Sequence, residues 1–194
     1  MIKSIYFDND ETLSHSVYQE PNQKHFRFTL ENGGVYYPII RPSAKRIIDF
    51  ARNLVGFENV KILTTATKDY IREINKVAEW GFLDEQLIAR EEISSSLRYP
   101  TDGSSHLEAS RYAHPENVLI DNLPPRENSD KISFLGIWKT YHANYFKVSD
   151  YYGFDFPDDP FEEYVMKFLE ERIAVTSMCK IRGEEENLEI QPTK

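Results

Sequence analysis

The stretch Ser4-Ile-Tyr-Phe-Asp-Asn-Asp-Glu-Thr-Leu13 decides the fold. It begins with a short β-branched and aromatic run, which predicts a buried strand over residues 5–7. Polar residues follow at once, and Asp8, Asp10 and Thr12 would point to the same side if the extended backbone continued. Two carboxylates held this close repel each other unless a cation or a shared proton intervenes. The stretch therefore predicts a hard-metal site, an acid/base pair, or both, at the end of a core strand.

The overall composition fits one medium-sized globular domain with its own core. The chain has 194 residues, of which 40% are hydrophobic and 28% are charged. Its formal net charge of −9 argues against extended, charge-driven binding to nucleic acid or to an anionic membrane. A small cationic pocket for a single phosphate group is still compatible with that charge.

Cysteine usage and hydropathy indicate a reducing, aqueous compartment. Cys179 is the only cysteine, so no disulfide can form within the chain. The first residues lead directly into the strand and leave no room for a signal peptide. No run approaches the roughly 18 consecutive apolar residues of a membrane span. We therefore expect a cytoplasmic protein without a membrane segment.

Strand and helix patterns alternate along the chain, which predicts an α/β fold with a parallel sheet and crossover helices. Hydrophobic residues recur at helical spacing over 44–54 and 68–80, and further helices are expected over 104–112 and 159–172. Strands beyond the first are predicted at 59–63, 87–89, 115–122, 132–138 and 145–148.

Residues 14–40 predict a small β-hairpin inserted after the first strand. The polar segment 14–24 is expected to be a loop because it is hydrophilic and is broken by a proline. Residues 25–30 and 35–40 predict two strands joined by a glycine-containing turn. We expect this hairpin to lie over the mouth of the site.

The insert belongs to a single predicted domain that covers residues 1–175. The charged segment 176–194 is expected to be a tail, frayed from Gly183 onward. No internal repeat is evident in the chain.

Polar residues follow three of the predicted core strands. Because the carboxyl ends of parallel strands meet at one edge of a sheet, these residues would converge on one crevice. Taken alone, the threonines could cap the next helix, and the third pair could form an Asx turn. The residues are Asp8, Asp10 and Thr12 after the first strand, Thr64 and Thr65 after the second, and Asp121 and Asn122 after the third.

The order of these motifs resembles that of the haloacid dehalogenase (HAD) superfamily, most of whose members are phosphatases. The closer resemblance is to its small carboxy-terminal-domain phosphatase branch, acyl-phosphate enzymes that dephosphorylate serine in proteins. It covers roughly residues 2 to 170 and implies a Rossmann-like three-layer core. The matching residues are Asp8 to Ser16, Arg41-Pro42, Leu63 to Ala66 with Tyr70, Arg90-Glu91, and Ile120 to Pro124.

The resemblance implies a reaction through an aspartyl-phosphate. Asp8 would be the nucleophile that attacks phosphorus. Asp10 would protonate the leaving oxygen and then activate the water that resolves the intermediate. Thr64 would hydrogen-bond a phosphoryl oxygen, and Thr12 would brace the first loop. The residues expected to contact the substrate are Thr12, Thr65, Arg90 and Arg111.

Mg²⁺ is the cofactor that the resemblance implies. It would be held by Asp8, by the backbone carbonyl of Asp10, and by Asn122 or Asp121, with waters completing an octahedral shell. Without the cation, the anionic carboxylate of Asp8 would approach an anionic phosphate unaided.

One departure from the family pattern concerns a lysine that neutralises the nucleophile and the phosphate. The chain has no lysine between Lys76 and Lys131, and the corresponding position falls near Ser105. An arginine could supply the charge, because guanidinium binds phosphate in a bidentate manner. The candidates are Arg90, Arg98 and Arg111, together with Lys68 just after the second motif.

The predicted function is that of a Mg²⁺-dependent phosphomonoester hydrolase acting on a phosphorylated protein or small molecule. A small insert would leave the site open to a macromolecular phosphate, such as a phosphoserine loop or a nucleic-acid end. The missing lysine supports an alternative, a catalytically weak HAD-fold protein that binds a phosphorylated partner. A phosphotransferase of the same fold is a third interpretation, because only water access separates it from a hydrolase.

Overall fold

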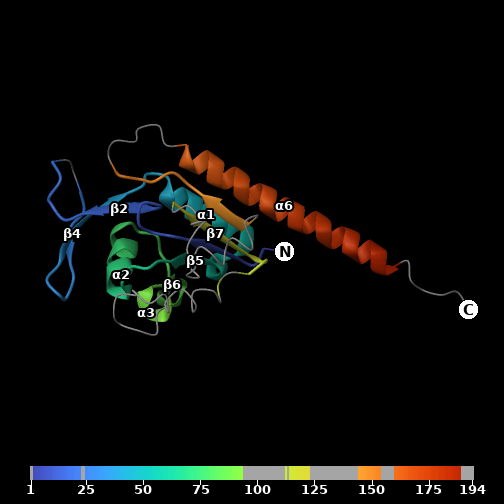
Figure 1. The fold of residues 1–194 in the computed structure, drawn as a ribbon, viewed down its shortest axis with the longest axis horizontal. Coiled ribbons are helices and arrows are strands. Elements are labelled where there is room, and N and C mark those ends of the chain that lie inside the picture. Colours follow the sequence, from blue (N-terminus) through green and yellow to red (C-terminus); the bar gives the residue numbers. More distant parts are fainter. Residues whose placement is uncertain are drawn as a thin grey trace, which may run out of the picture.

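A sheet of five parallel strands, ordered β6-β5-β1-β7-β8, forms the centre of the described part of the chain (Figure 1). The strands are β1 (Ser4–Phe7), β5 (Val60–Leu63), β6 (Leu87–Ile88), β7 (Asn117–Asp121) and β8 (Tyr145–Lys147). The computed structural model describes residues 2–22, 25–93, 112, 114–122, 144–153 and 160–188, with side chains described as far as residue 174. The sheet confirms the predicted α/β class.

β1 lies at the centre of the sheet, between β5 and β7. Its side chains alternate between the two faces, with Ile5 and Phe7 in one hydrophobic cluster and Tyr6 in another. All three side chains are buried, as expected for a strand that other layers cover on both faces. The hydrophobic run at the start of the chain is therefore the core strand around which the sheet is assembled.

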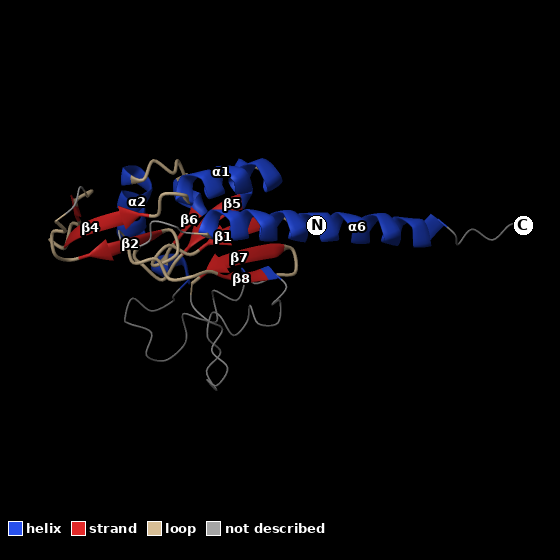
Figure 2. Ribbon diagram, turned by 90° about the horizontal axis from the view of Figure 1, so that it is seen from above, coloured by secondary structure: helices blue, strands red, loops and turns tan. Residues whose placement is uncertain are grey.

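Helices cover both faces of the sheet, which gives the three layers that were predicted. On one face, α1 (Ala44–Val55) and α2 (Lys68–Val77) both pack against the strands (Figure 2). On the same face, α6 (Phe161–Leu188) contacts α1. The short α3 (Arg90–Ile93) contributes Ile93 to the cluster on the opposite face. Two 3-10 helices, η1 (Phe57–Asn59) and η2 (Asp84–Gln86), lead into β5 and β6.

The insert forms a second, antiparallel sheet in which β4 (Val35–Ile40) is the middle strand. β4 pairs with β3 (Phe28–Thr29), which confirms the predicted hairpin. Its other edge pairs with β2 (Ser14–Val17), in the segment that was expected to be a loop. That expectation was wrong because backbone pairing with β4 overrides the weak strand propensity of Ser-His-Ser-Val.

The last helix is longer than predicted. It continues from the expected end at Arg172 to Leu188, into the segment that was predicted to be a frayed tail (Figure 1). No proline interrupts residues 161–188, and a single glycine such as Gly183 costs only about 1 kcal/mol in a helix interior. The predicted helix end at Arg172 was therefore wrong.

α2, in contrast, ends earlier than predicted, at Val77 instead of Trp80. Glu79 has a φ of 52°, a left-handed conformation that does not continue a right-handed helix. The Trp80 side chain is fully buried just beyond this turn.

Several expectations fall outside the described residues. These are the strand over 132–138, the helix over 104–112, and the positions of Arg98, Ser105 and Arg111. Of the helices that the structure describes, none is both long enough and apolar enough to cross a membrane.

The packing of α2 can be tested by truncating one of its buried side chains. Ile74 is fully buried, so Ile74→Ala should lower the free energy of unfolding by about 2–5 kcal/mol. Lys76→Ala, at an exposed position of the same helix, should change it by no more than about 0.5 kcal/mol. Urea unfolding followed by circular dichroism measures both. Similar small effects at the two positions would contradict the packing of α2 on the core.

Candidate active site

The register of the sheet brings the three predicted polar clusters to one edge. Phe7 of β1 is paired with Ile62 of β5 and with Ile120 of β7. The chain continues from these positions into Asp8, into Leu63-Thr64 and into Asp121-Asn122, and Asp8 N–H donates to the Ile120 carbonyl at 2.9 Å. The predicted convergence of the strand ends is therefore present in the structure.

A tight turn after β1 separates the two carboxylates. The carbonyl oxygen of Asn9 accepts the backbone N–H groups of Thr12, Leu13 and Ser14 at 3.2, 2.9 and 3.0 Å. Its side-chain oxygen accepts the Ser14 hydroxyl at 3.0 Å. Asn9 is fully buried, and the sequence analysis did not assign it a role. Asn favours turns, so its position between the two aspartates could have indicated a tight turn there.

The Thr12 hydroxyl joins the β1 loop to the end of β7. Its Oγ1 lies 3.1 Å from Asp8 Oδ2 and 3.1 Å from Asn122 Oδ1. It also accepts the backbone N–H of Asn122 at 3.0 Å. Thr12 is completely buried, so its position fits the predicted brace rather than a direct contact with substrate.

Arg41 supports this loop from behind, a role that the sequence analysis missed. Its side chain is only 1% exposed, and Nη1 donates to the Thr12 carbonyl at 2.7 Å. Nη2 donates to the Ser149 carbonyl at 3.3 Å, and the guanidinium lies 3.8 Å from the ring centre of Phe161. The family resemblance included the pair Arg41-Pro42, but it did not indicate what the arginine contacts.

Asp10 is held by a different set of partners from Asp8. Its Oδ1 accepts the Tyr70 hydroxyl at 3.0 Å and the Asn9 side-chain amide at 2.9 Å. Tyr70 Oη also lies 2.7 Å from Ser16 Oγ on β2. The strand missing from the sequence prediction thus supports the tyrosine that orients Asp10.

The environment raises the pKa of both carboxyl groups. Burial is the largest cause for Asp8, and the nearby charges of Asp121 and Asp10 raise its pKa further. Burial also raises the pKa of Asp10, while the hydrogen bond from Tyr70 acts in the opposite direction. Each group therefore retains its proton to a higher pH than a free aspartate.

The oxygen donors at this edge fit a hard cation such as Mg²⁺. Asp8 and Asp121 lie close enough to raise the pKa of Asp8, a conflict that a cation would relieve. The carbonyl oxygen of Asp10 accepts no hydrogen bond from any described residue. No three His, Cys, Asp or Glu side chains gather at metal-binding spacing within the described ranges. Backbone, amide and water oxygens would therefore share the coordination, as Mg²⁺ tolerates.

A cleft of about 570 Å³ lies beside Asp10. Thr65 and Arg90 line it, together with side chains of the insert. Thr64 is buried, and its Oγ1 accepts the Ala66 backbone N–H at 3.1 Å, which leaves its hydroxyl proton to donate elsewhere. The insert residues that line the cleft are Ser16, Tyr18, Leu30, Asn32 and Tyr36.

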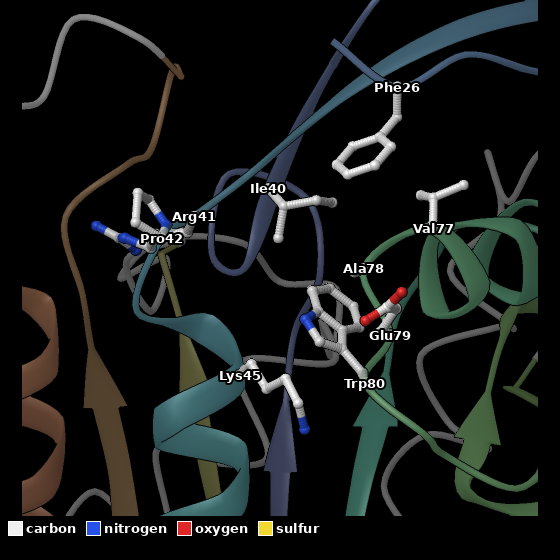
Figure 3. A pocket seen from close by; sticks show the side chains of 9 residues that line it. All are labelled: Phe26, Ile40, Arg41, Pro42, Lys45, Val77, Ala78, Glu79 and Trp80. Atoms are coloured by element: carbon white, nitrogen blue, oxygen red, sulfur yellow. The ribbon is translucent and has the colours of Figure 1, made fainter. Parts of the chain in front are cut away.

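A second cavity, of about 360 Å³, lies between the start of α1 and the end of α2 (Figure 3). Lys45, Val77 and Trp80 are among its lining residues. None of the predicted site residues that the structure describes lines this cavity, so it is separate from the cluster of carboxylates.

The profile of the family described as NLI interacting factor-like phosphatase matches residues 3–180. The chain belongs to this family. The match confirms the predicted resemblance and the HAD-type phosphatase class that it implied.

Two solved structures are similar to this NLI interacting factor-like phosphatase. One is fission yeast RNA polymerase II CTD phosphatase Fcp1-R271A bound to beryllium fluoride, with 17% identity and a TM-score of 0.49 over 91% of this chain and 51% of that chain. The other is Fcp1, described as an essential RNA polymerase II CTD phosphatase, with 18% identity and a TM-score of 0.49 over 100% and 55%. The chain thus spans about half the length of these two chains. A comparison with curated proteins finds no match.

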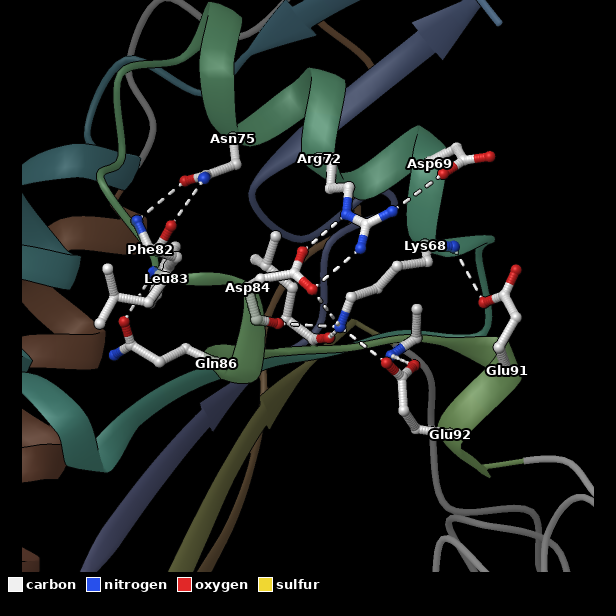
Figure 4. A network of polar contacts seen from close by, with 12 residues as sticks. Lys68, Asp69, Arg72, Asn75, Phe82, Leu83, Asp84, Gln86, Glu91 and Glu92 are labelled. Atoms are coloured by element: carbon white, nitrogen blue, oxygen red, sulfur yellow. Dashed lines mark hydrogen bonds and ion pairs between the residues drawn. The ribbon is translucent and has the colours of Figure 1, made fainter. Parts of the chain in front are cut away.

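Lys68, one of the candidates for the cationic side chain, does not line the cleft beside Asp10. Its Nζ donates to the carbonyls of Asp84, at 2.8 Å, and Leu87, and to Glu92 Oε1 at 2.7 Å (Figure 4). These contacts tie the start of α2 to η2, β6 and α3. Arg90 instead is the only cationic side chain among the described residues that line the cleft.

The raised pKa of Asp8 predicts a pH dependence of stability in the metal-free protein. Because the folded state binds this proton more tightly than the unfolded state, stability should fall as pH rises through the raised pKa. Asp8→Asn removes the charge, so at pH 7 in EDTA its Tm should exceed that of the wild type by about 2 °C or more.

The two proteins should instead have similar Tm values below pH 4, where the carboxyl group is protonated in both states. Differential scanning fluorimetry across the pH range measures the difference. A variant that is less stable than the wild type at pH 7 would show that the carboxylate is not under electrostatic stress.

Proposed function

We propose that this phosphatase is a Mg²⁺-dependent phosphomonoester hydrolase that acts through a phosphorylated Asp8. The observation that carries the proposal is the juxtaposition of Asp8 with Asp121 and Asn122 across β1 and β7, while Asp10 is held separately by Tyr70. Two carboxylates from one loop thus have different partners, which suits two different chemical roles.

Asp8 is the proposed nucleophile. Its carboxylate oxygen forms a bond to phosphorus while the bond between phosphorus and the leaving oxygen breaks. The contact between Thr12 Oγ1 and Asp8 Oδ2, at 3.1 Å, fixes the carboxylate before attack. A water then attacks the phosphorus of the aspartyl-phosphate, which releases inorganic phosphate and restores Asp8.

Asp10 is the proposed general acid and base. Its raised pKa keeps the proton available for the leaving oxygen, which takes it as the first bond breaks. The deprotonated carboxylate then accepts a proton from the attacking water. The Tyr70 hydroxyl favours the charged form, so it supports the second of these two steps.

Mg²⁺, when bound, would offset the negative charge shared by the nucleophile and the phosphate. Asp8, the Asp10 carbonyl, Asp121 and Asn122 are the residues proposed to hold it. Thr64 is proposed to donate its hydroxyl proton to a phosphoryl oxygen. Arg90 is proposed to contribute the cationic charge, with its Nε held by the Thr65 carbonyl at 2.7 Å.

The proposed substrate is a phosphate group carried by a protein or by another macromolecule. The cleft opens beside the catalytic loop, and the small insert contributes one wall of it without forming a separate domain. A phosphorylated segment could therefore reach Asp8 from the surface.

Hydrolysis of an aryl phosphate with and without Mg²⁺ tests the proposed reaction. We expect turnover that requires Mg²⁺ and that falls at least about 10³-fold in Asp8→Asn, because an amide cannot form the acyl-phosphate that a carboxylate forms. Asp10→Asn should also lose turnover but should still bind a phosphate analogue. Wild-type rates in Asp8→Asn would refute the nucleophile assignment.

Absence of turnover in folded, Mg²⁺-loaded wild-type protein would favour the alternative of a phospho-partner binding protein. Binding of a phosphopeptide, compared with its unphosphorylated form, would then be the decisive measurement.

The proposed role of Arg90 predicts that its removal lowers catalytic efficiency and leaves the stability of the fold unchanged. Arg90→Ala should lower kcat/KM for the aryl phosphate by about 10- to 100-fold, since charged hydrogen bonds contribute about 1.5–3 kcal/mol. Lys68→Ala, which breaks the contacts shown in Figure 4, should instead lower the thermal stability. Steady-state kinetics and Tm measurements on both variants separate the two roles. Unchanged kcat/KM in Arg90→Ala would assign the charge to another residue.

A further inference from the structure

Asn122 can present either its oxygen or its nitrogen to the proposed Mg²⁺ site. Only the oxygen can bind a cation, so the orientation of the amide decides whether the site is complete. The side-chain nitrogen Nδ2 donates to Asp150 Oδ1 at 3.0 Å, while Oδ1 faces Thr12 Oγ1 at 3.1 Å. The contact with Asp150 thus corresponds to the orientation that a metal site needs.

We propose that Asp150 is a positioning residue that holds the Asn122 amide with its oxygen toward the Asp8 carboxylate and thereby pre-forms the Mg²⁺ site. The inference rests on the proposed function, because it assumes that a cation binds there. It concerns a residue that neither the family resemblance nor the sequence motifs single out.

The backbone around Asp150 is fixed to the catalytic loops on both sides. Val148 N–H donates to the Asp121 carbonyl at 2.9 Å, and Tyr151 N–H donates to the Glu11 carbonyl at 2.7 Å. Arg41 Nη2 donates to the Ser149 carbonyl at 3.3 Å. Backbone contacts at Val148, Ser149 and Tyr151 therefore anchor the chain on both sides of Asp150, which is what a positioning role requires.

The carboxylate of Asp150 is itself oriented. Tyr152 Oη donates to Oδ2 at 3.1 Å, so both carboxylate oxygens have a partner. A reversed Asn122 amide would place its oxygen against this carboxylate and lose the hydrogen bond. Partners of this kind, which orient a metal ligand, typically change metal affinity by 10- to 100-fold when they are removed.

The hydrogen bond, rather than the charge, should carry most of the effect. Asp150 is exposed to solvent, where water and salt screen its charge from a cation at the site. Asp150→Asn keeps an oxygen that can accept from Asn122, whereas Asp150→Ala removes the acceptor. Comparing the two variants therefore separates positioning from simple electrostatic attraction.

Isothermal titration of Mg²⁺ into EDTA-treated and dialysed protein tests the proposal without relying on activity. Asp150→Ala should weaken Mg²⁺ binding about 10-fold or more, and Asp150→Asn should stay within about threefold of the wild type. Tyr152→Phe is the matched control, since it removes only the outer hydrogen bond and should also stay within about threefold. Circular dichroism of the metal-free proteins checks that all variants are folded.

The outcomes separate this inference from the proposed function. Mg²⁺ binding by the wild type that is unchanged in Asp150→Ala would overturn the positioning role and leave the proposed function intact. Equal weakening in Asp150→Asn and Asp150→Ala would also overturn it, because charge alone would then explain the loss. Wild-type protein that binds no Mg²⁺ would overturn both proposals at once.

Discussion

The position of β1 between β5 and β7 is the constraint on which the rest of the structure depends. A central strand must be hydrophobic on both faces, and its end then projects polar residues into a place where two neighbouring strands also end. The Thr12 hydroxyl converts this proximity into a fixed geometry by touching both Asp8 and Asn122. The order of the strands therefore brings the site residues together, and the Thr12 hydroxyl fixes their relative positions.

The site concentrates negative charge in a chain that is already acidic. Asp121 and Asp10 each lie near Asp8, and the hydroxyl groups of Thr12 and Tyr70 contact the carboxylates of Asp8 and Asp10. Such an arrangement is costly to the folded protein unless a positive partner binds, which is typical of sites shaped for function rather than for stability. The buried Arg41 lies behind the same loop, where it donates to the backbone carbonyls of Thr12 and Ser149.

Local pattern was sufficient to predict most of the core but not the contacts that shape the site. The spacing of hydrophobic residues predicts the strands β1, β4, β5 and β7 and the helices α1 and α2. The order of the polar residues at the strand ends follows from the order of these strands. β2 has almost no hydrophobic signal, since its pairing depends on β4. Arg41 contacts Ser149, which lies 108 positions away in the chain, and Asp150 contacts Asn122, which lies 28 positions away. Both contacts depend on tertiary structure in the same way. Lys68 was a reasonable candidate for the phosphate by position, but acceptors on η2, β6 and α3 already surround it.

The hydrogen bond between Thr12 and Asn122 joins residues that are 110 positions apart in the chain. During synthesis the ribosome delivers β1 first and β7 much later, at about 5–20 residues per second. For several seconds one edge of β1 therefore lacks its partner, and a hydrophobic strand with an open edge is a site for aggregation. The loop that follows β1 cannot take its final shape in this interval. The order of synthesis therefore makes the interval before β7 emerges the stage at which this strand is most exposed to wrong pairing.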